Sequence, residues 1–508
     1  MKKILVFLAA SVLMIGSAYA EIAWDGQTAT AWTQGDGSAS SPYIIATPSN
    51  LAYLAQQVRT GNSYTGKFFE QTEDFNLNYG WRSIGGIDAD YPTAAAFEGI
   101  YNGGNHSIYN LDNSSLFGLI KDATIQNLII QYEGTAGSLA TMVDETNGDC
   151  TISNCRNFAN ISSKNSVGGL VTTAKGSSLT LTWCDNYGYV SSSPSEDGSS
   201  ALLCVGGLVG MSYVSTLTLT SCHNGADCSC GSYDATASSD ISTIAGGLVG
   251  AVMEGSSVSI NKCSSEGNIT GNIVEQGDEC GVGHFIGLVS DTVACTIQRS
   301  YAKKGLAYNY LIGQCSSKAV LKGCYVIDET NYESSIFKPK ATAISCYYVN
   351  KFTENWGWYD FSWSTTSSYC FHYGGADISK GTFVPKAEMQ SEAFLPRINI
   401  DEEYFVMDYN NSNDGYPVLK WQGGTRYAIT ATCDATRGTV KGGGEYPEGY
   451  TATLTATPKS GCSFIGWSDG NTDNPRTVTV SGEATYIAQF TKSTYTIYVN
   501  QDCSSYIE

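Results

Sequence analysis

Four potential metal ligands lie within nine residues near the middle of the chain. Cys222-His223 is followed by Cys228 and Cys230, and soft ligands this close together could hold a zinc ion. Cys222, however, belongs to a position that recurs along the chain. Exported proteins also rarely keep free thiolates as ligands, and this chain carries an export signal, described below. We therefore expect packed thiols or a loop disulfide here, not a metal site.

Two other stretches contain groups that could bind calcium or transfer protons. Residues 469–474 begin like a calcium loop, but Val480 stands where the bidentate glutamate belongs. His106 lies near Asp112, yet the surrounding residues 103–107 have the composition of a turn. The hydrolase, zinc-protease, P-loop and dinucleotide motifs are all missing from the sequence. We therefore predict no catalytic residues, no bound metal and no cofactor.

Residues 352–373 are unusually rich in aromatic side chains. Rings exposed on a flat β surface could stack on sugar faces, because they combine apolar area with polar tips. Alternatively, these rings cover the end of the repeated domain described below, which must be capped. The candidate glycan contacts are Trp356, Trp358, Tyr359, Trp363 and Tyr373.

The first twenty residues predict export. Lys2 and Lys3 precede the apolar run Ile4–Ile15, which is too short for the ~20 residues that span a bilayer. Ala18-Tyr19-Ala20 then supplies the small-x-small pattern of a cleavage site, so the mature chain should begin near Glu21. We expect a secreted, extracellular protein at the cell surface, without membrane insertion of the mature chain.

The composition argues against nucleic acid as a partner. The full chain has 28 basic and 48 acidic residues and a net charge of −20. Such a surface repels phosphate backbones and anionic lipids. With four histidines and 15% charged residues, the chain also offers little material for acid–base chemistry.

An internal repeat dominates the central region. The run Val167-Gly-Gly-Leu-Val171 recurs three times, the last time in degenerate form, and its second glycine falls at positions 169, 207, 247 and 287. A cysteine follows 15 or 16 residues later, at positions 184, 222 and 263, behind a segment of alternating polar and apolar residues. Short strands at fixed spacing with glycines at the corners predict a solenoid. We expect about two coils per repeat, with an inward column of reduced cysteines, although some disulfides between coils remain possible.

These repeats resemble the GLUG-motif repeats of bacterial surface proteins. The resemblance extends to residues 37–77, including a helix in which Thr47 is the cap and Pro48 lies in the first turn. It also extends to a closing helix at 386–394 and a terminal strand at 413–421. The resemblance implies an all-β fold, a right-handed parallel β-helix with a short N-terminal capping helix, and an adhesive or surface role.

The pattern changes near Thr425 to long alternating strands. Together with Gly466-Trp467-Ser468-Asp469-Gly470, these strands resemble the divergent internalin-type B-repeat, with Trp467 and Phe464 in the core. We predict four regions: a signal peptide at 1–20, the β-helix domain at 21–424, a B-repeat-like domain at 425–491, and the start of a second, incomplete repeat at 492–508.

These features predict a non-catalytic adhesion or binding protein whose partner is a host or bacterial surface glycan or protein. Two alternatives remain open. One is a glycan-active enzyme, a polysaccharide lyase or hydrolase, because such enzymes also use parallel β-helices and their carboxylates would converge across coils. The other is a structural component that associates with itself.

Overall fold

The computed structural model describes residues 22–492 apart from a set of gaps. The residues outside the description are 78–79, 87–94, 112–113, 132–137, 144–147, 194–201, 232–241, 272–280, 305–309, 316–318, 329–340, 345, 351–357, 361–381, 385, 400, 402, 409–412, 414, 424–425 and 448–450.

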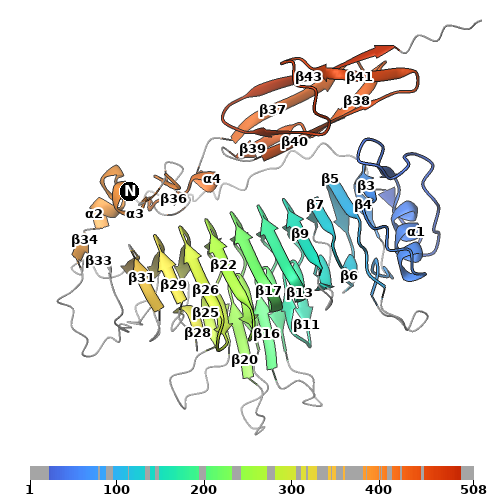
Figure 1. Ribbon diagram of the computed structural model, residues 1–508. Coiled ribbons are helices and arrows are strands. Elements are labelled where there is room, and N and C mark those ends of the chain that lie inside the picture. Colours follow the sequence, from blue (N-terminus) through green and yellow to red (C-terminus); the bar gives the residue numbers. More distant parts are fainter. Residues whose placement is uncertain are drawn as a thin grey trace, which may run out of the picture.

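Most of the chain forms a long parallel β-helix, as predicted (Figure 1). One column of strands runs the length of the solenoid: β3 (Phe68–Gln71), β5 (Ile100–Tyr109), β7 (Thr124–Ile130), β9 (Asp149–Ser153), β13 (Val171–Thr182), β17 (Val209–Thr220), β22 (Ser257–Asn261), β26 (Ala294–Gln298), β29 (Ala319–Lys322) and β31 (Ala341–Ile344). A second column follows it around a corner: β4 (Phe75–Asn76), β10 (Arg156–Asn157), β14 (Asp185–Asn186), β18 (His223–Asn224), β23 (Ser264–Ser265), β27 (Tyr301–Lys304), β30 (Tyr325–Asp328) and β32 (Tyr347–Asn350).

The remaining strands of the solenoid close each coil. They are β6 (Phe117–Ile120), β8 (Ala140–Val143), β12 (Val167–Gly168), β16 (Leu202–Gly206), β20 (Ser242–Gly246), β21 (Val249–Val252), β25 (Val282–Val289) and β28 (Tyr310–Cys315). A separate parallel sheet forms a side lobe from β11 (Ile161–Ser163), β15 (Val190–Ser192), β19 (Cys228–Cys230) and β24 (Ile269–Thr270). At the N-terminal end, β1 (Ile22–Ala23) and β2 (Tyr43–Ile45) pair with β4 and β3.

The expectation of two coils per repeat is wrong. Gly168 pairs with Gly206, 38 residues later, and Gly206 pairs with Gly246, 40 residues later. These offsets equal the repeat period, so each repeat forms one complete coil. The period alone could not show this, because one circuit here contains several strands, several corners and a side lobe.

The N-terminal helix is confirmed. Helix α1 (Pro48–Arg59) begins after Thr47, whose side chain accepts a hydrogen bond from the backbone N–H of Asn50, while the Asn50 side chain accepts one from the backbone N–H of Thr47. This reciprocal arrangement satisfies two backbone groups at the helix start. The helix buries an apolar stripe against the first coils: Leu51, Leu54, Ala55 and Val58.

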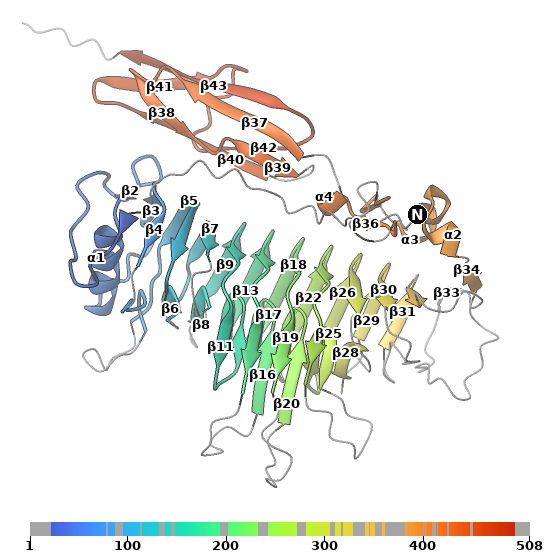
Figure 2. The same cartoon turned by 180° about the vertical axis from the view of Figure 1, so that it is seen from behind.

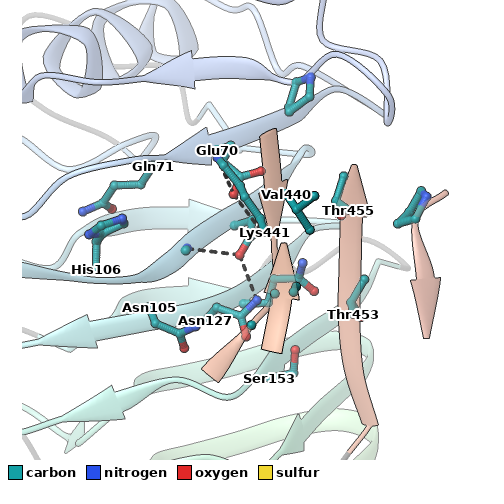
Figure 3. Close-up of a pocket in the computed structure, with 18 of the residues that line it drawn as sticks. Glu70, Gln71, Asn105, His106, Asn127, Ser153, Val440, Lys441, Thr453 and Thr455 are labelled. Atoms are coloured by element: carbon teal, nitrogen blue, oxygen red, sulfur yellow. Dashed lines mark hydrogen bonds and ion pairs between the residues drawn. The ribbon is translucent and has the colours of Figure 1, made fainter. Parts of the chain in front are cut away.

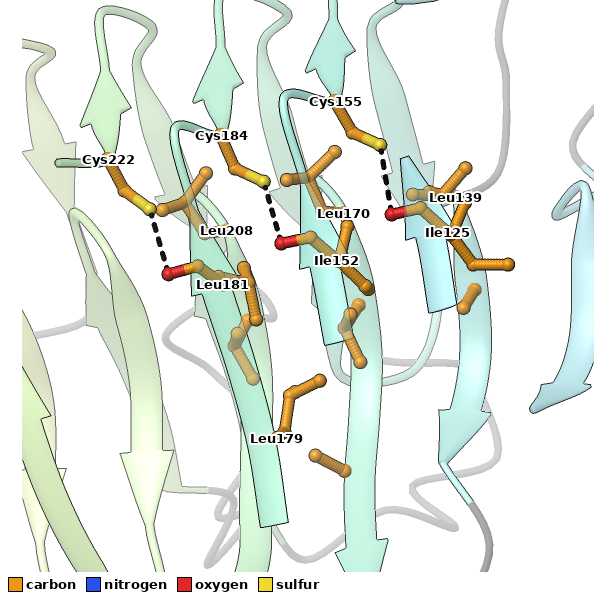
Figure 4. Packing of buried hydrophobic residues seen from close by; sticks show 14 of the residues in the cluster. Ile125, Leu139, Ile152, Cys155, Leu170, Leu179, Leu181, Cys184, Leu208 and Cys222 are labelled. Atoms are coloured by element: carbon orange, nitrogen blue, oxygen red, sulfur yellow. Dashed lines mark hydrogen bonds between the residues drawn. The ribbon is translucent and has the colours of Figure 1, made fainter. Parts of the chain in front are cut away.

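The predicted cysteine column is also confirmed, and it follows a corner that repeats in every coil. The residue before each column position has a positive φ, as at Asn154 (49°), Trp183 (57°) and Ser221 (53°). The following thiol then points inward and donates to a carbonyl of the preceding coil (Figure 4): Cys155 to Ile125, Cys184 to Ile152, Cys222 to Leu181, Cys263 to Leu219 and Cys324 to Ile297. These cysteines are free thiols in the structure.

Burial makes the cysteine column sensitive to alkali. Burial raises the pKa of the thiols of Cys155, Cys184, Cys222 and Cys324 well above their ordinary value of 9.0. The native state therefore holds these protons while the unfolded chain releases them above pH 9. We expect the free energy of unfolding to be unaffected by these groups below pH 9 and to fall above it, by up to ~1.4 kcal/mol per thiol per pH unit. Urea unfolding from pH 7.5 to 10.5 measures this fall.

A Cys184→Val variant supplies the control for this prediction. It removes one buried thiol, so unfolding releases about one proton fewer above pH 9. The free energy of unfolding should therefore fall less steeply with pH than in the wild type. A free energy of unfolding that stays constant between pH 8 and 10.5 would contradict the prediction.

A second column, of asparagines, lies two residues beyond the cysteines. Asn157, Asn186 and Asn224 are at most 1% exposed. The Nδ2 of Asn157 donates to Oδ1 of Asn186 at 2.8 Å, and the Nδ2 of Asn186 donates to Oδ1 of Asn224 at 2.8 Å. Each Nδ2 also donates to the carbonyl two residues ahead in its own coil. The column thus joins adjacent coils while satisfying their buried corners.

After the solenoid, the chain ends the parallel sheet and then turns back. Strands β33 (Trp358–Asp360) and β34 (Thr382–Val384) pair antiparallel at its C-terminal end. The closing segment comprises α2 (Lys386–Met389), η2 (Glu392–Phe394), α3 (Leu395–Ile398), β35 (Phe405–Val406), β36 (Val418–Leu419) and α4 (Lys420–Gly423).

Two predictions for this closing segment need correction. The closing helix at 386–394 is broken, because Ser391 is extended and its hydroxyl donates to the carbonyl of Glu388. The terminal strand at 413–421 shrinks to Val418–Leu419, because Pro417 has no N–H to donate and the chain becomes helical at Lys420.

The closing segment runs back along the corners of the solenoid. Asp401 forms ion pairs with Arg299 (3.3 Å) and Lys322 (2.7 Å), and the Nε1 of Trp421 donates to the carbonyl of Lys262 at 3.0 Å. The C-terminal domain therefore lies over the N-terminal coils (Figure 2). It contains β37 (Arg426–Cys433), β38 (Gly438–Lys441), β39 (Gly444–Pro447), β40 (Thr451–Pro458), β41 (Cys462–Trp467), β42 (Arg476–Thr479) and β43 (Ala484–Lys492).

The core of the C-terminal domain matches the prediction in its main residue. Trp467 is 1% exposed, and Phe464 is partly buried against the same cluster. The strands form two small sheets, in the orders β39-β37-β43-β41 and β38-β40-β42.

Candidate functional site

A cleft separates the C-terminal domain from the first coils of the solenoid (Figure 3). Its volume is about 950 Å³, within the ~300–1,000 Å³ typical of small-molecule sites. One wall comes from β3, β5, β7 and β9, and the other from β37, β38 and β40. Residues far apart in the sequence therefore form one concave surface.

Among the described residues that line the solenoid wall, five carry side-chain amides: Gln71, Asn102, Asn105, Gln126 and Asn127. The Nδ2 of Asn154, a residue just behind the lining, donates to Oδ1 of Asn105 at 3.1 Å and to Oδ1 of Asn127 at 2.8 Å. The Nδ2 of Asn127 in turn donates to Oδ1 of Asn102 at 2.8 Å. Asn105 and Asn127 have φ values of 63° and 55°, a region that asparagine tolerates better than most residues. Gln126 lines the same wall from β7.

The opposite wall presents hydroxyl groups. Thr453 and Thr455 alternate with buried residues along β40, so both point out of the domain core and into the cleft (Figure 3). Gly442 follows β38 with a φ of 90° and lies so close to β40 that a Cβ would be 1.9 Å from the carbonyl oxygen of Thr453. This tight turn holds Lys441 at the edge of the cleft.

One ion pair joins the two walls. The Nζ of Lys441 lies 2.7 Å from Oε1 of Glu70, whose side chain is only 8% exposed. The Nδ2 of Asn102 also approaches Oε1 of Glu70 at 3.4 Å. The pair is therefore shielded from solvent on the Glu70 side, where screening is weaker than at an open surface.

A charge reversal at Lys441 should release the C-terminal domain. Lys441→Glu would place a second carboxylate beside the buried Glu70, and the two would repel each other. We expect an increased maximum dimension in small-angle X-ray scattering, and recovery of the wild-type profile when Glu70→Lys is added. Lys459→Glu makes the same charge change on the same domain, away from the cleft, and should leave the profile unchanged. Identical profiles for all variants would contradict a role for this pair.

In its described lining, the cleft does not contain the paired carboxylates of a glycosidase. Among the described residues that line it, Glu70 is the single acidic side chain, and it is engaged by Lys441. Acid–base hydrolysis of a glycosidic bond generally needs two carboxyl groups facing the scissile bond. The described lining is suited to binding through amides and hydroxyls.

Of the aromatic residues predicted as glycan contacts, the two that the structure describes, Trp358 and Tyr359, are not part of this cleft. Trp356, Trp363 and Tyr373 lie outside the described residues. Trp358 and Tyr359 belong to β33, and their backbones pair with Val384 and Phe383 of β34 at the far end of the solenoid. Their role as a sugar platform or a cap stays a prediction.

The possible zinc ligands do not converge. Cys222 packs in the main core of the solenoid, whereas Cys228 and Cys230 pack in the core of the side lobe. Burial raises the pKa of both side-lobe thiols to about 12. Within the described part of the chain, no group of three or more His, Cys, Asp or Glu side chains could hold a metal ion.

The other two candidates have structural partners. Asp469 forms a 2.7 Å ion pair with Arg476, and this hydrogen-bonded contact lowers the pKa of Asp469. His106 lies in strand β5, at an irregularity next to Gly104 and Asn105, and not in a separate turn. Its Nδ1 is 3.2 Å from Oδ1 of Asp74, while Asp112 lies outside the described residues.

Only part of the cleft was predicted from the sequence. His106, which lines the cleft, was a candidate there, but Glu70, Asn127 and Lys441 were not. One signal was available in the sequence. Asn127 and Asn154 directly precede Leu128 and Cys155, which point into the core, and the residue before such an inward position has a positive φ. Asparagine tolerates that conformation better than most residues. No comparable signal pointed to Glu70 or Lys441.

Comparison with known families identifies the last domain. Residues 427–494 match the family model described as the divergent InlB B-repeat domain. The C-terminal domain is a divergent InlB B-repeat. This type of domain is typical of bacterial surface proteins. The B-repeat thus forms the hydroxyl-bearing wall of the cleft and supplies Lys441.

The other comparisons add little. No curated protein matches the chain. A crystal structure of a candidate immunoglobulin A1 protease from Bacteroides ovatus is 16% identical, with a TM-score of 0.41, and covers 77% of this chain and 95% of that one. This distant likeness carries no functional argument. In the part of the chain that the structure describes, no helix is long and apolar enough to cross a membrane.

Proposed function

We propose that this chain is an exported, non-catalytic binding protein of the bacterial surface. The solenoid is the rigid body of the protein, and the B-repeat folds back onto it to form a binding cleft. The observation that carries the proposal is the B-repeat, a domain typical of bacterial surface proteins. The export signal predicted at residues 1–20 and the GLUG resemblance of the solenoid agree with the same role.

The cleft lining supports binding over catalysis. Its described residues offer amides and hydroxyls in number but a single carboxylate, Glu70. The glycan-active enzyme therefore has less support, while the self-associating component stays an alternative, and each predicts a distinct measurement. The enzyme would release reducing ends or unsaturated sugars from polysaccharides. The structural component would form larger assemblies as its concentration rises.

The test uses labelled protein comprising residues 21–508. It is incubated with immobilised mucin, isolated bacterial cell walls and intact epithelial cells, and bound label is measured against protein concentration. We expect saturable binding to at least one of these surfaces, no release of sugars and a monomer in sedimentation. No saturable binding to any of the three surfaces, or measurable sugar release, would overturn the proposal.

A further inference from the structure

We infer that the cleft between the B-repeat and the first coils binds a neutral oligosaccharide, held by amides of the solenoid on one side and hydroxyls of the B-repeat on the other. This inference rests on the proposed binding function and names the class of ligand. It concerns a different place from Trp358 and Tyr359, which belong to β33 at the opposite end of the solenoid.

The polar groups of the two walls match the chemistry of sugars. An amide side chain both donates and accepts hydrogen bonds, and so does a hydroxyl, so each can pair with a sugar hydroxyl in either sense. Gln126 presents such an amide from β7, and Thr453 and Thr455 present hydroxyls from β40. Trp183, which is partly exposed, also lines the cleft and offers ring surface to the C–H face of a sugar, whereas Tyr446 is buried in the core of the B-repeat.

The charges of the cleft favour an uncharged ligand. Its one lining carboxylate and its one lysine neutralise each other across the 2.7 Å contact between Glu70 and Lys441. The molecule as a whole has a net charge of −20 and would repel polymers of uronic or sialic acids. A neutral sugar does not face an unpaired buried charge in the cleft, and the negative charge of the molecule does not repel it.

Most of the wall strands cannot accept an extended peptide. Strand β40 lies between β38 and β42, β5 lies between β3 and β7, and β7 lies between β5 and β9. A peptide that binds by strand addition needs a free sheet edge, which these three strands do not offer. Strand β38 is the edge of its described sheet, but it lines the cleft with two residues, Val440 and Lys441. Along β5, β7 and β40, recognition therefore falls to the side chains.

A pair of matched double variants tests the inference. Gln126→Ala with Thr455→Val removes one amide and one hydroxyl from the cleft. Gln298→Ala with Thr457→Val removes the same groups outside it, since Gln298 lies in the same strand column as Gln126 and Thr457 lies on β40, two residues beyond Thr455. Neither control residue lines the cleft. Thr→Val preserves side-chain shape, and circular dichroism checks that each variant is folded.

Isothermal titration with neutral hexasaccharides of glucose, mannose, xylose and N-acetylglucosamine measures the outcome, with polygalacturonate as the anionic comparison. We expect residues 21–508 to bind at least one neutral hexasaccharide with a dissociation constant below about 1 mM. The cleft variant should bind this hexasaccharide about tenfold more weakly than the wild type does. The control variant should bind it with wild-type affinity. The wild-type protein should not bind polygalacturonate.

Three results would overturn the inference: no binding of any neutral hexasaccharide, equal affinity of cleft variant and wild type, or preference for polygalacturonate. If the protein still binds mucin, cell walls or epithelial cells in those cases, the proposed surface function stands and only the assignment to this cleft fails. If it binds none of the surfaces, the proposed function fails as well.

Discussion

Gly207→Ala is expected to destabilise the central coils by at least ~3 kcal/mol, because the new methyl group has no room. A Cβ on Gly207 would lie 2.1 Å from the carbonyl oxygen of Gly247 in the next coil and 2.4 Å from Cγ of Asn224. Both neighbours are fixed: the N–H of Gly247 donates to the carbonyl of Gly283 in the following coil, and Asn224 belongs to the asparagine column. The coils would have to separate locally to admit the methyl group.

Urea or thermal unfolding of the two proteins measures this loss. Gly231→Ala is the matched control in the same repeat, because its nearest neighbour would lie at 3.4 Å, an ordinary contact distance. We expect the control to change stability by less than about 1 kcal/mol. Equal stability of the two variants would show that the glycine pair is not required by packing.

Asn186→Ala is expected to cost about 3–4 kcal/mol, since the side chain is fully buried and bonded on both sides. The substitution removes the acceptor for Nδ2 of Asn157 and the donors to Asn224 and to the carbonyl of Gly188. It also leaves a cavity between two coils. Unmet polar groups at such a depth are costly, because no solvent replaces the lost partners.

Chemical denaturation compares Asn186→Ala with Asn165→Ala, an exposed asparagine one coil earlier. The exposed variant should remain within about 0.5 kcal/mol of the wild type. Native-state hydrogen exchange adds a local readout, in which amides of β14 and β18 should lose protection before those of α1. Unchanged stability of Asn186→Ala would contradict a structural role for the asparagine column.

The repeat carried much of the fold information in the sequence. Alternating residues before Cys184, Cys222 and Cys263 placed these thiols inside, and the structure confirms it. The repeat placed the glycine pairs at corners, but it did not show that a Cβ at Gly168 or Gly207 would collide with the neighbouring coil. Nor did it show that a positive φ falls on the residue before each of these cysteines, such as Trp183. Sequence spacing shows that a position is constrained. It does not show whether the constraint is a collision with the next coil or a positive φ.

The cleft could not be predicted for a different reason. Glu70 and Lys441 meet only because the closing segment returns along the solenoid and fixes the direction of the B-repeat. That return depends on contacts such as those of Asp401 with Arg299 and Lys322, which leave no pattern in the sequence. Local periodicity therefore predicts coils and strands but not the placement of one domain on another.

The arrangement of one coil per repeat has a mechanical consequence. Hydrogen bonds between coils run along the solenoid axis, so a pull on one end would load the outermost coil first. Each coil that peeled away would release the residues between paired positions, for example 22 between Ala319 and Ala341 and 40 between Gly206 and Gly246, or about 70 to 130 Å of extended chain. The protein would then lengthen in steps whose size identifies the coil that opened, dissipating load while the coils behind remain intact.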